Sequence, residues 1–258
     1  MSTKFQLKIS LILLMLISAG GVEAQTTDSA SVKVIYSEVK YKPIRPKALI
    51  VPAVFIAYGA SAPYIKPLKK LDDDTNFELR EDHPRFGFHA DDYLRYVPVA
   101  AVYGLDLAGI KSKHNLVDRT AMLLLSTAIA GGSTFITKNI TNRTRPNGLD
   151  NHSFPSGHTS MAFMAAEFMH QEYKDQSPWY SIMGYSVAVT TATLRLYNGA
   201  HWLSDVVAGA GYGVLSTKIS YWAYPFIKDK LFHNKANHTV LVPFHQEGHT
   251  GLTFVRKL

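Results

Sequence analysis

The feature that most constrains the fold of this chain is a series of apolar segments separated by short polar stretches. The longest of them, residues 120–137, contains eighteen residues and no charged side chain. Other segments are apolar or repeat apolar residues at helical spacing, over residues 48–65, 96–110, 158–173, 179–194 and 206–217. Because such segments are typical of helices that pack against one another, the sequence predicts an all-α body of about six helices within residues 47–228.

The first residues have the pattern of an export signal. Lys4 and Lys8 lie near a polar start, residues 9–19 form an apolar run, and residues 22–24 place small side chains at the cleavage positions. We therefore expect a signal peptide over residues 1–24, a mature start near Gln25 and an extended polar leader over residues 25–46. An uncleaved anchor helix is the alternative, although the apolar run is shorter than the ~20 residues of a spanning helix. Either outcome exports the bulk of the chain.

Two other stretches depart from the helical pattern. Residues 66–85 are rich in charge and follow Pro63, so they are predicted as a loop. Apolar and polar residues alternate at 239–242 and again at 252–255, with Gly248 and Gly251 between them. Because this alternation is typical of strands and glycine of turns, residues 229–258 are predicted to form a C-terminal β-hairpin tail.

Composition narrows the possible chemistry but not the relation to a membrane. The chain has no Cys, which excludes disulfides, thiolate metal sites, cysteine nucleophiles and a lipidated Cys. Its formal charge of +7 suits a phosphate-rich partner such as an anionic lipid or nucleic acid. Most apolar segments are shorter than the ~20 residues that span a bilayer. Both a bundle embedded in or attached to a membrane and a soluble periplasmic bundle therefore fit the sequence.

Three short segments carry the side chains needed to hold and cleave a phosphoester without a metal. They are residues 138–146 after the charge-free segment, residues 155–158 at a helix start, and residues 195–205. Charge on the phosphoryl oxygens must be met by cations and backbone donors. Lys138, Arg145 and Arg195 are predicted to supply the cations. Ser156 and Gly157 are predicted to add a hydroxyl and free N–H groups at a helix N-terminus, which attracts anions.

Nucleophilic and proton chemistry is assigned to two histidines and one carboxylate. His201 and Asp205 are four residues apart, so on a helix they lie on one face within reach of each other. The carboxylate would fix the imidazole tautomer and leave the other ring nitrogen to attack phosphorus. His158 is then the acid that protonates the leaving oxygen and the base that later activates water. The alternatives are a structural ion pair for His201 and Asp205, and snorkelling charges at helix ends for Lys138, Arg145 and Arg195.

Together these segments resemble the signature of the type 2 phosphatidic acid phosphatase (PAP2) and vanadium haloperoxidase superfamily. The resemblance rests on Lys138 and Arg145-Pro146, on Pro155-Ser156-Gly157-His158, and on Arg195, His201 and Asp205 at spacings of six and four. It covers residues 120–213. It implies a helical bundle, a phosphohistidine intermediate on His201, and an enzyme that needs no metal or other cofactor.

One position departs from this signature. The family usually has Ser before the Arg of its third segment, whereas this chain has Leu194. One hydroxyl on the phosphate side is therefore either missing or supplied by Thr191, Thr193 or Ser204. We expect a modest change in phosphate contacts rather than a loss of activity.

Two charged features lie beside the signature. Arg143 is inside the first segment but off its pattern, and both a solvated charge and a substrate contact are compatible with that position. Asp91 and Asp92 resemble half of a metal site, but no further ligands follow them at useful spacing. A surface or capping role is therefore predicted for the two carboxylates.

The resemblance and the predicted export signal imply a bacterial envelope phosphatase acting on a lipid phosphate or diphosphate. Only eight residues separate Pro146 from Pro155, so little chain is available for a lid, and an open pocket suits a bulky headgroup. A phosphate of lipid A is the first choice of substrate, with undecaprenyl diphosphate, phosphatidylglycerophosphate and phosphatidic acid as alternatives. We expect an inner-membrane location, an active site facing the periplasm and no nucleic-acid partner.

Three further functions fit the same fold. A soluble acid phosphatase of broad specificity would hydrolyse p-nitrophenyl phosphate rapidly without detergent. A haloperoxidase would oxidise bromide with peroxide, but such proteins are typically far longer than this chain. A non-catalytic membrane protein would release phosphate from no lipid. Assays of the purified protein separate these hypotheses.

Overall fold

The structure, a computed structural model, describes residue 44 and residues 46–232, 239–246 and 249–256. The predicted export signal and residues 25–43 of the predicted leader lie outside the described residues. The helices of residues 46–232 are α2 (Lys47–Ser61), α3 (Lys66–Asp82), α4 (Asp91–Leu94), α5 (Val97–Leu107), α6 (Leu116–Thr141), α7 (Gly157–Tyr173), α8 (Pro178–Tyr197) and α9 (Leu203–Phe232). No strand occurs within residues 46–232, so this body is all-α, as the sequence predicts.

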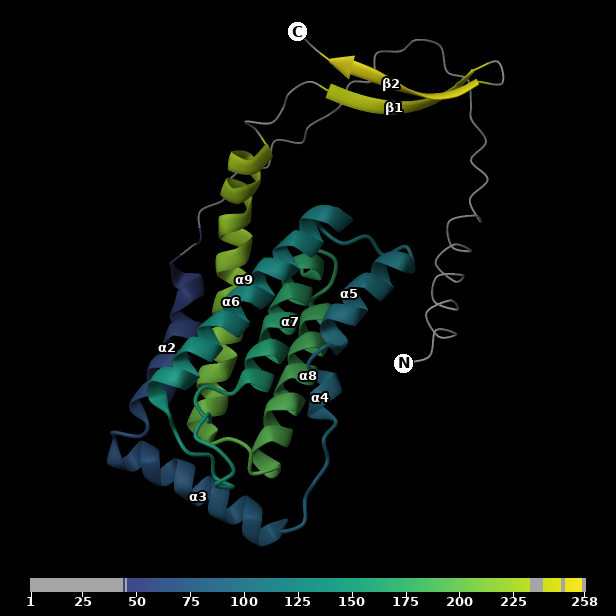
Figure 1. Ribbon diagram of the computed structural model, residues 1–258. Helices are drawn as coiled ribbons and strands as arrows, with labels where there is room; N and C mark the ends of the chain where they lie inside the picture. The colour runs from purple at the N-terminus through teal and green to yellow at the C-terminus, as the bar shows by residue number, and fades with distance from the viewer. Residues whose placement is uncertain (1–43, 45, 233–238, 247–248, 257–258) are drawn as a thin grey trace, which may run out of the picture. The chain divides into compact units, whose positions relative to one another are not determined.

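Helix α7 is the central element of the helical body. It packs against α5, α6, α8 and α9 (Figure 1). Residues 164–169 of α7 are all buried, and Phe168 and Tyr173 form a fully buried cluster with Val102 of α5. The Tyr173 hydroxyl donates to the carbonyl oxygens of Val102 and Ile110, each at 3.0 Å. Because α7 is enclosed by its neighbours, its first turn has a fixed position in the body.

Helix α9 approaches α7 closely because two glycines of α9 face α7. A Cβ added at Gly213 would lie 2.2 Å from the carbonyl oxygen of Ser160, and one at Gly209 would lie 2.7 Å from that of Ser156. Both distances are well below van der Waals contact, so a larger residue would force the backbones apart. The small residues of the 206–217 segment therefore allow the close approach that the sequence predicts.

The structure corrects the prediction of a loop over residues 66–85. Lys66–Asp82 form α3, which has Pro67 in its first turn, where the missing N–H of proline breaks no helical hydrogen bond. Leu68, Asp72 and Leu79 are less exposed than most of their neighbours and recur at helical spacing. The high charge of the segment made this period hard to recognise. With the single-turn helix α4, α3 raises the helix count in residues 46–232 from about six to eight.

Helix α6 contains the charge-free segment and has a defined cap at each end. The Asn115 side chain accepts a hydrogen bond from Asp118 N at 2.9 Å, and Asn142 ends the helix in the left-handed conformation with φ of 47°. Among the described residues, α6 alone has the length and composition to cross a membrane as a single helix. Helices α2 and α3 pass the same test only as a pair, which is bent by 86°.

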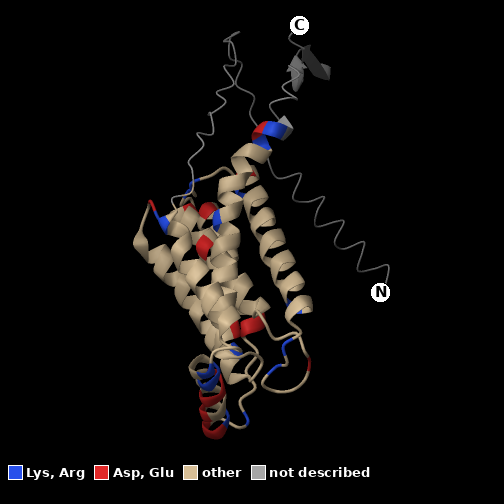
Figure 2. Ribbon diagram, turned by 90° about the vertical axis from the view of Figure 1, so that its left-hand side faces the viewer, with Lys and Arg blue, Asp and Glu red and all other residues tan. Residues whose placement is uncertain are grey.

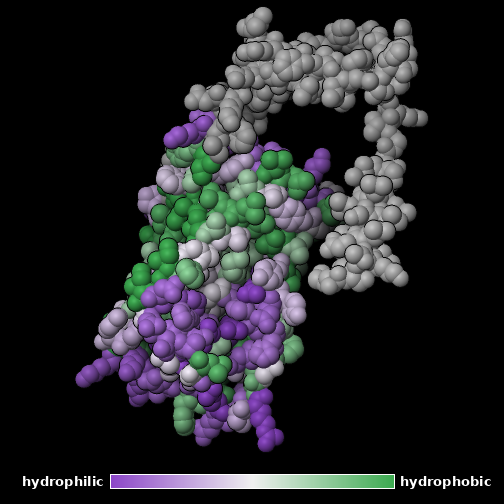
Figure 3. Space-filling model, viewed as in Figure 1, coloured by the Kyte–Doolittle hydropathy of each residue, from purple (hydrophilic) through white to green (hydrophobic). Residues whose placement is uncertain are grey.

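Apolar and charged residues occupy different parts of the helical body. Figure 3 shows hydrophobic residues along much of the helices and hydrophilic residues at the end that holds α3. Figure 2 shows the charges of α3 at that end and few charged residues along the middle of the bundle. We use the name apolar surface for the exposed side chains of α2, α6 and α8, which include Ile50, Val54, Leu124, Phe135, Ile182 and Val189. The body therefore has a polar end and an exposed apolar surface.

The described C-terminal residues form two antiparallel strands, β1 (Thr239–Gln246) and β2 (His249–Arg256). Val240 pairs with Val255, and Phe244 pairs with Gly251. The strands are longer than the alternating segments in the sequence, and Gly251 lies within β2 rather than in a connection.

Candidate active site

The three predicted segments meet at one end of the helical body. The eight predicted site residues are Lys138 at the end of α6, Arg145 in the loop that follows, Ser156, Gly157 and His158 at the start of α7, Arg195 near the end of α8, and His201 and Asp205 at the start of α9. These helix ends lie on the side of the body that holds α3 (Figure 1). The structure therefore brings together residues that are up to 67 positions apart in the sequence.

His201 lies between a cation and a carboxylate. Its Nε2 is 3.3 Å from Nη1 of Arg145, and its Nδ1 is 3.7 Å from Oδ2 of Asp205, which is longer than a hydrogen bond. The side chain is almost fully buried. Burial lowers the pKa of the imidazole to about 4, and the nearby Asp205 only partly opposes this effect. The ring is therefore neutral near pH 7, with Nε2 facing the basic residues.

Asp205 is held in place by contacts on both carboxylate oxygens. Its Oδ1 accepts a hydrogen bond from Nη1 of Arg143 at 2.7 Å. Its Oδ2 accepts from Oγ of Ser153 at 2.5 Å and from the backbone N of Trp202 at 2.9 Å. The backbone N of Ser156 donates to the carbonyl oxygen of Asp205 at 3.0 Å. The first turn of α9 is thus tied directly to the start of α7.

The start of α7 is a capped helix N-terminus next to a lysine. The Ser156 hydroxyl oxygen accepts from the backbone N of Thr159 at 3.4 Å, so this buried hydroxyl serves as the helix cap. A Cβ added at Gly157 would lie 3.9 Å from Cε of Lys138. The N-terminal turn of α7 and the Lys138 side chain therefore border the same space.

Lys138 and Arg145 have different partners. Lys138 Nζ donates to the carbonyl oxygen of His152 at 2.5 Å, in the loop between α6 and α7. Arg145 Nε donates to Oδ1 of Asp150 at 2.7 Å, and the Asp150 side chain is 44% exposed. The Arg145 contact is therefore an ion pair that solvent reaches, whereas Lys138 is bound by a neutral carbonyl group.

Arg195 is anchored by the carboxylate of Asp91, a pairing that the sequence analysis did not predict. Its Nη1 donates to Oδ2 of Asp91 at 2.7 Å, and Asp91 is fully buried. Its Nε is buried with no hydrogen-bond partner among the described residues. Since buried donors are rarely left unpaired, this Nε is a position where an anionic ligand would add a missing partner. The predicted surface or capping role is therefore wrong for Asp91.

Asp92 contacts the other predicted catalytic histidine. Its Oδ1 lies 2.7 Å from Nε2 of His158, and this hydrogen bond lowers the pKa of the Asp92 carboxyl. Burial and the charge of Arg195 lower the pKa of His158, while Asp92 raises it. The two adjacent carboxylates of α4 thus each bind one residue of the three predicted segments.

Asp91, Asp92 and His158 also form the group that is closest to a metal-binding arrangement in the described chain. Each offers one ligand atom, and the three atoms lie within 4.8 Å of one another. His158 supplies the ligand that sequence spacing did not reveal. The carboxylates are already paired, however: Asp91 forms an ion pair with Arg195, and Asp92 forms a hydrogen bond with His158.

The structure excludes one of the two roles that the sequence suggested for Arg143, that of a solvated charge. Its guanidinium group donates to Asp205, to Oγ of Ser204 at 2.8 Å, and to Oδ2 of Asp72 at 2.8 Å. The side chain is 16% exposed, so it is not a solvated charge. It binds two carboxylates of the protein, and a contact with substrate stays a prediction.

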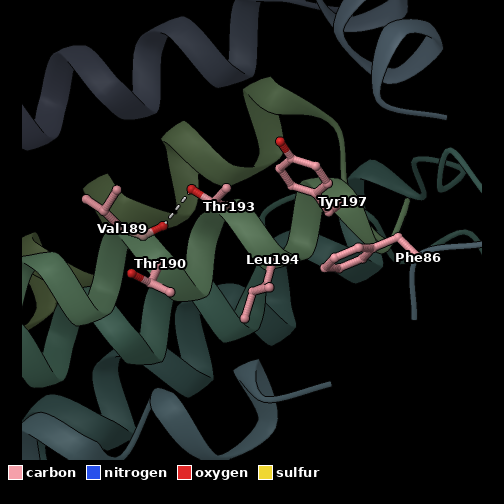
Figure 4. Close-up of a pocket in the computed structure, with 6 residues that line it drawn as sticks. All are labelled: Phe86, Val189, Thr190, Thr193, Leu194 and Tyr197. Atoms are coloured by element: carbon pink, nitrogen blue, oxygen red, sulfur yellow. Dashed lines mark hydrogen bonds between the residues drawn. The ribbon is translucent and has the colours of Figure 1, made fainter. Parts of the chain in front are cut away.

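Leu194 lines a groove that contains none of the predicted phosphate-binding residues. With Phe86, Val189 and Tyr197 it lines this groove of about 240 Å³ along α8 (Figure 4). The structure thus places an apolar wall where the family usually has a hydroxyl.

The three hydroxyls that could replace the missing one have other partners. Thr191 donates to the carbonyl oxygen of Val187 and Thr193 to that of Val189, each at 2.9 Å. Ser204 donates to Oδ2 of Asp72 at 2.5 Å. Each hydroxyl proton is therefore used within the chain, which favours a missing hydroxyl over a substituted one.

Comparison with known families agrees with this geometry. Residues 119–229 match the sequence model of the PAP2 superfamily, and the match contains all eight predicted site residues. This chain carries a PAP2 superfamily domain. The PAP2 domain begins in α6 and ends in α9, so Asp72, Asp91 and Asp92 lie N-terminal to it.

The chain is similar to a curated enzyme and, more distantly, to two solved structures. The lipid A 1-phosphatase of Porphyromonas gingivalis is 35% identical over 178 residues, which are 68% of this chain and 39% of that protein. The chain thus spans about two fifths of this relative. LpxE of Aquifex aeolicus is 20% identical with a TM-score of 0.43, over 55% of this chain and 92% of that one. A transmembrane PAP2 type phosphatidylglycerolphosphate phosphatase of Bacillus subtilis is 17% identical with a TM-score of 0.48. The match covers 74% of this chain and 97% of that one.

Proposed function

We propose that this chain is a metal-independent phosphatase that hydrolyses a phosphomonoester or diphosphate of a bacterial envelope lipid through a phosphohistidine on His201. The observation that carries the proposal is the position of His201, a buried neutral imidazole with Nε2 beside Arg145 and Nδ1 facing Asp205. A nucleophile next to cations, with a carboxylate behind it, suits transfer of a phosphoryl group to a side chain. A phosphate of lipid A is the first choice of substrate, supported by the similarity to the Porphyromonas gingivalis enzyme.

In this proposal the phosphoryl group binds between Lys138, Arg145 and Arg195. The buried Nε of Arg195 gains a partner when a phosphoryl oxygen accepts its hydrogen bond. The first turn of α7 adds backbone N–H groups, because helix N-termini attract anions, and Gly157 places no side chain over them. Arginine side chains suit this task because their planar donors match phosphoryl oxygens in pairs.

The reaction then proceeds in two displacements. Nε2 of His201 attacks phosphorus in line, and the P–N bond forms as the P–O bond to the lipid breaks. His158 gives its proton to the leaving oxygen, and Asp205 stabilises the positive charge on the phosphorylated imidazole. His158 next accepts a proton from water, the water oxygen attacks phosphorus, and inorganic phosphate leaves as the P–N bond breaks. Asp92 favours the protonated form of His158 that the first step needs.

We also propose that the protein acts in the inner membrane, with the active site toward the periplasm. Helix α6 has the length and composition of a span, and only 22% of its apolar window is buried within the chain. The site lies at the polar end of the body, so a phosphorylated headgroup could reach it while the acyl chains stay in the bilayer. An alkaline carbonate wash should leave the protein in the membrane pellet. Recovery in the soluble fraction would contradict membrane insertion.

The test of the function is phosphate release by the purified protein from a panel of substrates. The panel contains lipid A, undecaprenyl diphosphate, phosphatidylglycerophosphate, phosphatidic acid and p-nitrophenyl phosphate. Lipid A should react fastest, and His201→Ala should lower its rate by at least about a thousandfold, as loss of a nucleophile typically does. Full activity of His201→Ala would refute the assigned nucleophile.

The other outcomes of the panel have equally definite meanings. A higher rate with another lipid would reassign the substrate. Rapid hydrolysis of the soluble ester without detergent would indicate an acid phosphatase of broad specificity. Release from no substrate would leave a non-catalytic protein with this fold.

A further inference from the structure

A buried ion network connects α3 with the carboxylate behind His201. Arg143, in the loop after α6, divides its guanidinium group between two carboxylates. Nη1 donates to Oδ1 of Asp205 at 2.7 Å, and Nη2 donates to Oδ2 of Asp72 at 2.8 Å. Asp72 is 1% exposed and Asp205 is fully buried. One positive charge thus lies between two buried negative charges, an arrangement that is stable only with well-formed hydrogen bonds.

Asp72 also binds the first turn of α9. Its Oδ1 accepts from the backbone N of Ser204 at 2.8 Å, and its Oδ2 accepts from Oγ of Ser204 at 2.5 Å. The first N–H groups of a helix have no partner inside the helix, and a carboxylate near them is stabilised by the helix dipole. Asp72, which belongs to α3, therefore caps the start of α9. The residue that it binds, Ser204, directly precedes Asp205.

The network helps to orient the Asp205 carboxylate toward His201. Arg143 holds Oδ1, while Oδ2, which also accepts from Ser153 Oγ and Trp202 N, faces Nδ1 of His201 at 3.7 Å. Burial raises the pKa of the Asp205 carboxyl, but His201 and the charge of Arg143 hold it below its ordinary value. The ring of Trp202 lies near the guanidinium carbon of Arg143, 5.6 Å from it, and partly covers the network.

We propose that Arg143 and Asp72 are positioning residues that fix the Asp205 carboxylate behind His201, so that α3, which lies outside the PAP2 domain, belongs to the active site. The proposal rests on the proposed role of His201 as nucleophile. Neither residue touches the phosphoryl group, so their removal should slow the transfer of phosphate to His201 without weakening substrate binding. A substrate contact at Arg143 would instead raise KM.

The test uses Asp72→Asn and Arg143→Lys, with Asp73→Asn as the matched control. Asp73 is exposed and adjacent on α3, so the control makes the same chemical change without touching the network. Arg143→Lys keeps a positive charge between the two carboxylates, which preserves folding, but an ammonium group lacks the planar fork that bridges them. Wild-type melting temperatures and elution volumes identify the variants that are folded.

We expect kcat to fall about 10- to 100-fold in both network variants, the loss typical when a partner of an orienting residue is removed. KM should change less than about threefold, and the single-turnover rate of phosphohistidine formation should fall in parallel with kcat. The double variant should lose about as much kcat as the more impaired of the two single variants, because the two residues act as one unit. Asp73→Asn should match the wild type.

Wild-type kcat in either folded network variant would overturn the proposal. So would a rise in KM at constant kcat for Arg143→Lys, because it would make Arg143 a substrate contact. Failure of the proposed function is distinguishable, since the wild type would then release no phosphate or His201→Ala would stay active. An inactive Asp72→Asn variant beside an equally inactive Asp73→Asn control would also contradict a specific role for the network.

Discussion

Replacement of Gly213 with alanine tests the close packing of α9 on α7, which sets the spacing of the site. A Cβ at Gly213 would lie 2.2 Å from Ser160 O and 2.7 Å from Met164 N. Ordinary contact begins at 3.4 Å, so the two helices must separate by about 1 Å to accept the methyl group. Both obstructing atoms belong to the backbone of α7, which cannot turn aside as the end of a side chain can.

The change in the free energy of unfolding caused by Gly213→Ala is the sum of two opposing effects. Overpacking a core costs about 1–3 kcal/mol, and a backbone obstruction places Gly213→Ala at the upper end of that range. The preference of helices for alanine over glycine returns up to about 1 kcal/mol. A net loss of about 2 kcal/mol corresponds to a decrease in Tm of roughly 4–8 °C for a chain of this size.

The matched control is Gly132→Ala in α6, where an added Cβ meets nothing within 4 Å. Helix preference alone acts there, so Tm should stay the same or rise by about 2–4 °C. Thermal unfolding of the purified proteins, followed by circular dichroism, measures both variants. Because Asp205 lies about two turns before Gly213, Gly213→Ala should also lower kcat. An unchanged Tm for Gly213→Ala would refute the close contact of α7 and α9.

Three further predictions concern α4 and its partners. Asp92→Asn removes the group that raises the pKa of His158, so the basic limb of the pH profile of kcat/KM should move to lower pH; an unmoved limb would argue against His158 as the acid. Asp91→Asn loosens Arg195 and should raise the inhibition constant of inorganic phosphate about tenfold, or ~1.4 kcal/mol; an equal constant would separate Arg195 from phosphate binding. EDTA should leave activity intact, whereas a loss restored by added metal would show that Asp91, Asp92 and His158 hold an ion.

The site residues of the three segments can be predicted from the sequence because those within one segment are only a few positions apart. His201 and Asp205 are four positions apart, and Lys138 and Arg145 share one helix end and its loop, so spacing and side-chain chemistry are enough to group them. Their grouping at one end of an all-α body follows, since each segment borders a helix terminus.

The carboxylates that bind these segments cannot be found in this way. Asp72 lies 71 positions from Arg143, and Asp91 lies 104 positions from Arg195. No local pattern relates residues so far apart, and in the sequence both carboxylates sit among other charges that resemble a solvated surface. Burial is what distinguishes them from neighbours such as Asp73, and burial depends on the packing of α3 and α4 against α8 and α9.

The carboxylate partners also divide the arginines of the site into two kinds. Asp91 is fully buried, so the pair with Arg195 has no solvent to replace either partner and should persist when substrate binds. Asp150 is 44% exposed, so the pair with Arg145 is weak and a phosphoryl group can displace the carboxylate into water. Under the proposed function, Arg195 then offers its unpartnered Nε from a fixed position, while Arg145, which lies 3.3 Å from Nε2 of His201, exchanges one anion for another beside the proposed nucleophile. In the proposed mechanism, substrate binding and the release of Asp150 are therefore coupled beside the atom that attacks phosphorus.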